Sequence, residues 1–178
     1  MQSLEQPFSG VHLLQPKVFT DERGEFVKTF HAPTFAGLGI AFAPREEFFS
    51  TSRRNVIRGM HFQLPPHGHG KLVYCIRGAV LDVVIDLRKL SATFGGVYST
   101  QLTAANRRIL FLPPGLGHGF VAQEDDTVMV YQTDKVHVPA ADSGVRWDSF
   151  GFDWGCANPV ISPRDREFPG LPEFHSPW

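Results

Sequence analysis

The sequence predicts an all-β protein, folded as a sandwich or barrel with a few short helices. Short runs of aromatic and β-branched residues recur about every 8–12 residues, which is the strand spacing of such folds. The chain contains 16 Phe, 17 Gly and 14 Pro, so aromatic strands alternate with strong turn residues. Its 178 residues are enough for a sizeable core, and we expect a single domain over residues 1–178.

The expected elements follow these runs in order. The run PTFAGL predicts a helix over 33–38, because proline favours the first helical position. Strands are expected over 11–19, 25–30, 97–102, 107–112, 119–122 and 127–132. The tail from residue 158 onward is proline-rich and lacks periodicity, so we expect it to wrap the surface or lie across a neighbouring element.

The strongest pattern is KLVYCIRGAVLDVVIDLR, residues 71–88, in which Arg77-Gly78 marks a turn between two strands. Alternate residues of a strand face opposite sides. One face of the second strand carries Leu81, Val83, Ile85 and Leu87. The other carries Val80, Asp82, Val84 and Asp86, and its carboxylates predict contact with solvent or a polar cavity.

Charge and hydropathy argue against several classes of protein. The formal net charge is −1, so there is no bulk electrostatic case for a nucleic-acid or membrane partner. No apolar run approaches the roughly 20 residues needed to cross a bilayer. The segment MQSLEQPFSG has neither the basic nor the apolar region of a secretory signal, so a cytoplasmic protein is expected.

The segment RGMHFQLPPHGHGK, residues 58–71, raises the hypothesis of a metal site. Such sites often combine His-x-His with a nearby carboxylate and a distant histidine. His67, His69 and His118 supply the histidines, but no Asp or Glu follows His69 until Asp82. Lys71 would also repel a cation in the same pocket. We therefore predict no bound metal, and solvated loop positions for His67 and His69.

A metal-free site would use a different set of residues. His61, Lys71, His118 and Tyr131 lie at expected strand ends or tight turns, where the mouth of a barrel would gather them. Neutral His is a base near pH 7, Lys stabilises a developing oxyanion and Tyr can donate a proton. Together they fit proton abstraction next to a carbonyl. The alternative is that each of these residues has no catalytic role and is a polar group at the end of a strand whose hydrogen bonds are made within the protein.

A series of motifs in order carries a resemblance to a known family. They include PKVFTDERGEF (16–26), SRRNVIRGMHFQLPP (52–66), RRILFLPPGLGHGF (107–120) and PVISPRDR (159–166). From about Val11 to Leu171 the chain resembles the dTDP-4-dehydrorhamnose 3,5-epimerases. The resemblance implies a cupin jelly roll, a homodimer, and no cofactor or metal. The substrate it implies is a nucleotide-diphosphate 4-keto-6-deoxy sugar, epimerised at C3, C5 or both.

The resemblance also implies roles for individual residues. By motif position the base falls on His61, its carboxylate partner on Asp165 and the general acid on Tyr131. The cation near the keto oxygen falls on Lys71. Substrate-binding positions fall on Phe19, Arg23, Phe26, Arg58, Gln63 and His118. The resemblance thereby implies that the tail folds back to orient an imidazole.

Three places depart from the family's usual pattern. Lys28 stands where Glu is frequent, Glu46-Glu47-Phe48-Phe49 where Gln-Asp-Asn-His is frequent, and Val136-His137 where Tyr-Tyr is frequent. The first two suggest a base other than thymine, in a CDP- or GDP-linked sugar, and the third suggests a mono-epimerase. Further alternatives are a ketoisomerase, a metal cupin and a non-catalytic sugar-binding module, although binding alone needs neither base nor acid.

Overall fold

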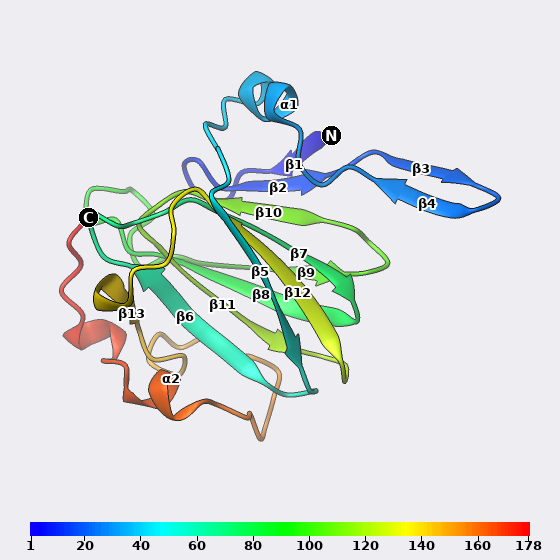
Figure 1. Cartoon of the computed structure of the whole chain (residues 1–178). Coiled ribbons are helices and arrows are strands. Elements are labelled where there is room, and N and C mark those ends of the chain that lie inside the picture. The colour runs from blue at the N-terminus through cyan, green and yellow to red at the C-terminus, as the bar shows by residue number, and fades with distance from the viewer.

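Two antiparallel β-sheets face each other in the computed structural model, which describes all residues 1–178 (Figure 1). The six strands of the first sheet, in spatial order, are β1 (Gln2–Glu5), β2 (His12–Gln15), β10 (Ile109–Leu112), β7 (Lys71–Arg77), β12 (Thr127–Thr133) and β5 (Glu46–Ser52). The five strands of the second are β13 (Asp142–Gly144), β6 (Ile57–Gln63), β11 (Leu116–Ala122), β8 (Ala79–Asp86) and β9 (Val97–Thr103). The arrangement is the all-β, cupin-like sandwich that was expected.

The remaining elements are short. A separate hairpin pairs β3 (Val18–Asp21) with β4 (Gly24–Val27). The two α-helices are α1 (Ala32–Gly37) and α2 (Pro163–Glu167), and two 3₁₀ turns cover Pro139–Ala141 and Leu171–Glu173. None of these helices is long and apolar enough to cross a membrane.

The main core lies between the two sheets, and the alternation in β8 decides which side chains enter it. Val80 and Val84 pack inward, while Val83 and Ile85 pack on the outer face, as expected. The carboxylates of Asp82 and Asp86 do not meet solvent: both residues are 0% exposed. His118 pairs with Asp82 and Arg88 pairs with Asp86, so partners within the protein replace water.

The C-terminal tail covers the outer face of the second sheet (Figure 1). Its apolar side chains pack there on residues of β6 and β8; they include Ile161, Leu171, Phe174 and Trp178. Burying this face removes apolar surface from water and stabilises the fold by about 25 cal/mol per Å². The expectation that the tail lies across a neighbouring element is confirmed, and it brings α2 beside β6.

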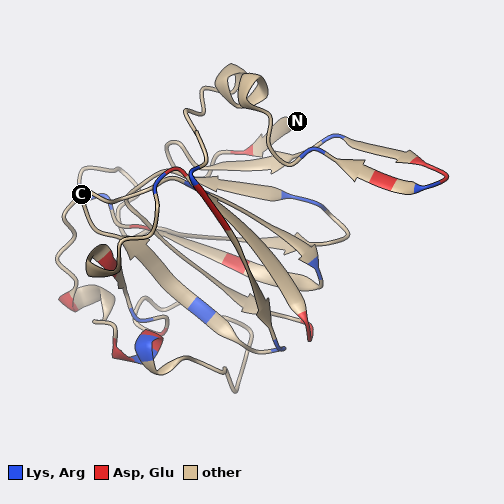
Figure 2. Ribbon diagram, in the orientation of Figure 1, with Lys and Arg blue, Asp and Glu red and all other residues tan.

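The β3–β4 hairpin projects away from both sheets (Figure 1). Phe19 and Phe26 lie opposite each other across its strands and remain 49% and 61% exposed. Acidic and basic residues gather at its tip, as Figure 2 shows. Two large apolar side chains on a projecting element form a surface that the single chain leaves uncovered.

Most expected elements are confirmed, and the differences have local causes. The strands expected within 71–88 are β7 and β8, and the helix expected over 33–38 begins one residue earlier, at Ala32. The single strand expected over 11–19 is wrong, because Pro16 lacks the N–H needed to continue the ladder between β2 and β3. Strands β1, β5, β6 and β13 were not predicted.

The missed strand β6 contains a glycine where its backbone closely approaches that of β11. Gly59 has a φ of +147°, and a Cβ there would lie 2.6 Å from the Cα of Gly119 on β11. Only glycine permits this approach of two backbones. A glycine within a short run lowers the strand signal in the sequence, which is why the run was not recognised.

Candidate active site

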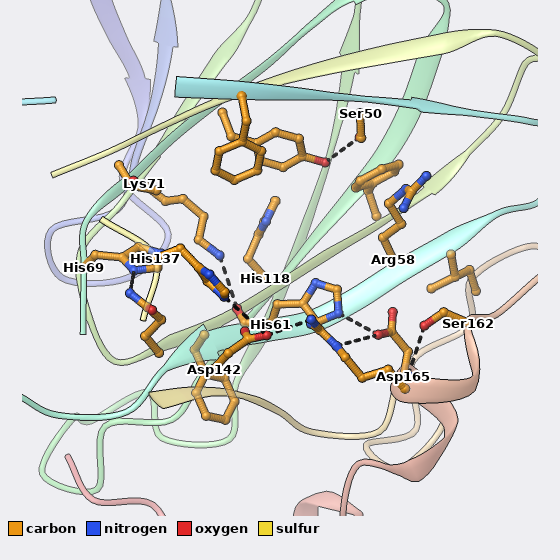
Figure 3. Close-up of a pocket in the computed structure, with 18 of the residues that line it drawn as sticks. Ser50, Arg58, His61, His69, Lys71, His118, His137, Asp142, Ser162 and Asp165 are labelled. Carbon is orange, nitrogen blue, oxygen red and sulfur yellow. Dashed lines mark hydrogen bonds and ion pairs between the residues drawn. The ribbon is translucent and has the colours of Figure 1, made fainter. Parts of the chain in front are cut away.

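A cavity of about 800 Å³ opens between the two sheets. This volume lies in the range of about 300–1,000 Å³ that is usual for sites that bind small molecules. Of the ten predicted site residues, seven line it: Arg58, His61, Gln63, Lys71, His118, Tyr131 and Asp165. Figure 3 shows several of these side chains converging from β6, β7 and α2.

His61 and Asp165 form a hydrogen-bonded pair at the wall of the cavity. His61 Nε2 lies 2.9 Å from Asp165 Oδ1. Because the carboxylate can only accept, Nε2 carries the proton and Nδ1 is the free basic nitrogen. Burial lowers the pKa of His61, opposed by the hydrogen bond that His61 donates to Asp165, so the ring is neutral near pH 7. His61 lies within β6, so its expected place at a strand end is wrong.

The tail holds the Asp165 carboxylate in a fixed orientation. Ser162 caps α2, and its Oγ accepts a hydrogen bond from the Asp165 backbone N–H at 3.1 Å. The Gly59 N–H donates to Asp165 Oδ2 at 3.2 Å. Burial alone would raise the pKa of Asp165, but the hydrogen bonds from His61 and Gly59 hold it below its usual value. The carboxylate is therefore ionised and fixes the imidazole.

Lys71 begins β7 and reaches toward β6. Its Nζ donates to the backbone oxygen of His61 at 3.3 Å. Burial lowers the pKa of Lys71 to about 8, opposed by the nearby carboxylates of Asp142 and Asp82. The ammonium is therefore still charged at pH 7, in a poorly solvated place where its field is strong.

Tyr131 enters from β12, on the sheet opposite His61. Its hydroxyl lies 3.1 Å from Ser50 Oγ. The ring of Phe48 stacks on it, with centroids 4.8 Å apart and planes inclined by 13°. Burial raises the pKa of Tyr131, so the phenol keeps its proton at neutral pH. Like His61, Tyr131 lies within a strand rather than at its end.

His118 lies inside β11, so its expected place at a strand end or tight turn is wrong. Its Nε2 is 2.9 Å from Asp82 Oδ2, and both side chains are buried. The ring packs edge-on toward Tyr131, with centroids 6.4 Å apart. His118 therefore forms a polar part of the cavity wall next to Tyr131, and the buried Asp82 holds its ring in place.

Arg58 and Gln63 line the cavity in different ways. Arg58 is exposed, and its guanidinium donates to Ser52 Oγ and to the Thr51 carbonyl. Gln63 is 2% exposed, and its amide makes four hydrogen bonds to other groups of the protein. Gln63 therefore holds the surrounding loops together.

His69 lines the cavity and is half-buried, so its expected position as a solvated loop residue is wrong. The reason is its hydrogen bond to Gln63, which draws the ring inward. His67 is not among the residues that line the cavity. No three His, Cys, Asp or Glu side chains stand close enough together to hold a metal ion.

The three other predicted site residues, Phe19, Arg23 and Phe26, lie on the β3–β4 hairpin, outside this cavity. Arg23 pairs with Asp21 at 2.5 Å, and both are exposed. Within one chain, therefore, the hairpin residues and the cavity residues do not come together.

Several lining residues were not predicted as site residues, namely Glu46, Phe48, Ser50, His137, Asp142 and Arg164. A signal existed for Glu46, Phe48 and His137, because each lies in a segment that departs from the family pattern. Ser50 shares the inner face of β5 with Phe48, two residues away. Asp142 and Arg164 pair with each other at 2.7 Å across 22 residues, a contact without a local signature.

The arrangement provides a base, a cation and an acid around one cavity. The neutral His61 can remove a proton, Lys71 can stabilise an oxyanion, and Tyr131 can return a proton from the other sheet. These groups suit an exchange of protons next to a carbonyl.

Known proteins share both the sequence and the fold. The family model for dTDP-4-dehydrorhamnose 3,5-epimerase matches residues 5–173. A dTDP-4-dehydrorhamnose 3,5-epimerase of Shigella flexneri is 36% identical over 170 residues, 93% of each chain. The Bacillus anthracis enzyme, solved with TDP and PPi, superposes with a TM-score of 0.94 at 34% identity, covering 96% of this chain and 99% of that one.

A 3'-monoepimerase from Streptomyces bikiniensis, solved with dTDP-quinovose, is also similar. It has a TM-score of 0.88 at 30% identity, over 94% of this chain and 86% of that one. These matches define the class: the chain is an isomerase, one of the epimerases of nucleotide-linked sugars. Within that class it belongs to the dTDP-4-dehydrorhamnose 3,5-epimerase family, as the resemblance of its motifs implied.

Proposed function

We propose that the chain epimerises a dTDP-linked 4-keto-6-deoxy sugar at C3 and C5, by removing and returning protons next to the keto group. The observation that carries this proposal is the position of His61 and Tyr131. They come from opposite sheets, on β6 and β12, and both line the same cavity. Inversion of a carbon requires a base on one face of the ring and an acid on the other.

The first step is proton abstraction. His61 Nδ1 takes the proton from the carbon, and the C–H electrons move toward the keto oxygen to form an enolate. A proton next to a ketone is weakly acidic, so the enolate needs strong stabilisation. The Lys71 ammonium supplies it in a partly water-excluded place. Asp165 stabilises the imidazolium that forms.

The second step returns a proton to the other face. The Tyr131 hydroxyl donates to the carbon, and the enolate electrons form the new C–H bond. Its raised pKa makes Tyr131 a weak acid, which suits a basic enolate carbon. Exchange with solvent then removes the proton from His61 and returns one to Tyr131.

The nucleotide end of the substrate is proposed to involve a second copy of the chain. Arg58 is the exposed cation of the cavity and suits a diphosphate. In a homodimer, the projecting hairpin would supply Phe19, Arg23 and Phe26 to the partner's cavity. The TDP and dTDP-quinovose bound to two similar proteins support a thymidine nucleotide. A cytoplasmic location stays a prediction.

The function is tested with dTDP-4-keto-6-deoxyglucose in deuterated water, followed by proton NMR. We expect deuterium at C3 and C5 in the product. We also expect His61→Ala to abolish exchange while dTDP still binds. Absence of exchange with the wild-type protein, or normal exchange by His61→Ala, would overturn the proposal.

A mono-epimerase is the second candidate, since His137 lines the cavity and the Streptomyces bikiniensis relative is a 3'-monoepimerase. The same NMR experiment decides between them, because a mono-epimerase incorporates deuterium at one carbon only. The alternative of another base concerns Glu46, a carboxylate that also lines the cavity. Calorimetry compares the affinities for dTDP, CDP and GDP, and a clearly higher affinity for dTDP would exclude that alternative.

A further inference from the structure

The loop before β7 contains a histidine that this mechanism does not use. His69 lies two residues before Lys71, and both line the cavity. Figure 3 shows His69, Lys71 and His137 at one end of the cavity and Arg58 at the other. A polar ring in this place can contact the sugar on the same side as Lys71.

Gln63 fixes which nitrogen of the His69 ring carries the proton. Gln63 Nε2 lies 3.2 Å from the His67 carbonyl oxygen and 3.4 Å from that of Val136, so this atom must be the amide nitrogen. On the other side, Gln63 Oε1 accepts the Val138 N–H at 2.5 Å. Gln63 Nε2 therefore donates to His69 Nδ1, at 2.8 Å, and the His69 proton lies on Nε2.

The environment also keeps this imidazole neutral. Burial lowers the pKa of His69 to about 3, helped by the positive charges of Lys71 and Lys135. His69 therefore presents an N–H dipole without a charge at every physiological pH. Such a donor suits an uncharged oxygen, whereas the neighbouring lysines suit an anion.

We propose that His69 is a specificity residue that donates its Nε2–H to the 3-hydroxyl oxygen of the sugar, and that Gln63 is its positioning residue. This inference rests on the proposed function, in which Lys71 faces the 4-keto oxygen. On the ring, the neighbours of the keto carbon are C3, which carries a hydroxyl, and C5, which carries the methyl group. Of these two substituents only the hydroxyl accepts a hydrogen bond.

The test measures calorimetric binding of dTDP-quinovose and its 3-deoxy analogue to the wild-type protein and to His69→Phe. The wild-type protein is expected to prefer dTDP-quinovose by about three- to tenfold, the usual value of one neutral hydrogen bond. His69→Phe keeps a ring of similar shape without the donor, and it should bind both ligands equally. A variant that discriminates as well as the wild-type protein would overturn the role of His69.

Two further measurements sharpen this result. His67→Phe is the matched control, because His67 lies in the same loop but does not line the cavity, and it should keep the wild-type preference. Loss of the preference in that control as well would assign the effect to the loop rather than to His69. Nitrogen-15 NMR of the histidine rings should show His69 protonated on Nε2 alone, and a proton on Nδ1 would contradict the proposal.

Failure of this inference is distinguishable from failure of the proposed function. A wild-type protein that neither binds dTDP-quinovose nor exchanges protons at C3 and C5 would overturn the function itself. A wild-type protein that does both, with no difference between the two ligands, would overturn only the contact between His69 and the 3-hydroxyl.

Discussion

At the scale of single residues, the chemistry depends on which nitrogen of His61 carries the proton. Asp165 holds that proton on Nε2 and leaves Nδ1 free. Asp165→Asn replaces the carboxylate by an amide that can donate to Nε2, so the proton moves to Nδ1 and the base is lost. We expect kcat to fall by about 10²–10⁴-fold, measured by steady-state turnover, with unchanged binding of dTDP.

Asp148→Asn is the control for this change, since Asp148 is an exposed carboxylate paired with Arg146. It should keep the wild-type kcat. If Asp165→Asn were as active as Asp148→Asn, Asp165 would have no part in orienting the base.

The pH dependence of turnover follows from the same residues. His61 must be neutral to act as a base, so activity rises as pH increases through its lowered pKa. Lys71 must be charged to stabilise the enolate, so activity falls as pH increases through about 8. A bell-shaped profile of kcat/KM is therefore expected, with its alkaline limb near pH 8.

Lys71→Arg tests the assignment of the alkaline limb. A guanidinium keeps its charge to much higher pH, so any activity that remains should no longer fall near pH 8. An unchanged alkaline limb in this variant would show that another group titrates there.

At the scale of elements, the β3–β4 hairpin carries large apolar side chains that no other part of the single chain covers. Phe26 is 61% exposed on it, which suits burial against a second copy. If the proposed homodimer forms through this hairpin, Phe26→Ser should sediment as a monomer in analytical ultracentrifugation where the wild-type protein sediments as a dimer, and it should have a raised KM for the dTDP-sugar.

Phe94→Ser is the matched control, because Phe94 is 50% exposed but lies in the loop between β8 and β9. It should leave the sedimentation coefficient and KM unchanged. A Phe26→Ser protein that sediments and turns over like the Phe94→Ser protein would refute the role of the hairpin.

Elements also show where sequence patterns succeed and fail. The alternation of β8 was predictable because both faces carry buried aliphatic residues, Val80 and Val84 on the inner face and Val83 and Ile85 on the outer one. Strand β5, EEFFSTS, was missed because it lies at the edge of its sheet, where exposed polar residues interrupt the alternation. Its residues Phe48 and Ser50 contact Tyr131, so that part of the site was missed with the strand.

At the scale of the whole molecule, the site exists only because two sheets and a tail meet. Lys71 and Tyr131 come from the first sheet, His61 from the second and Asp165 from the tail. Residue types alone suggested the base, cation and acid, whereas only the family motifs pointed to Asp165. The inward position of His69 depends on three loop contacts made by Gln63, and no local pattern encodes them.

The pairing of His61 with Asp165 spans 104 residues of the chain. During synthesis from the N-terminus, all the strands of the two sheets precede α2. The two sheets can therefore assemble before His61 has its partner Asp165. Catalytic competence is therefore acquired last, when the tail docks on β6. A proteolytically clipped chain that lacks the tail would keep the strands of both sheets but lose Asp165 and the part of the cavity wall that the tail forms, so it would lose turnover.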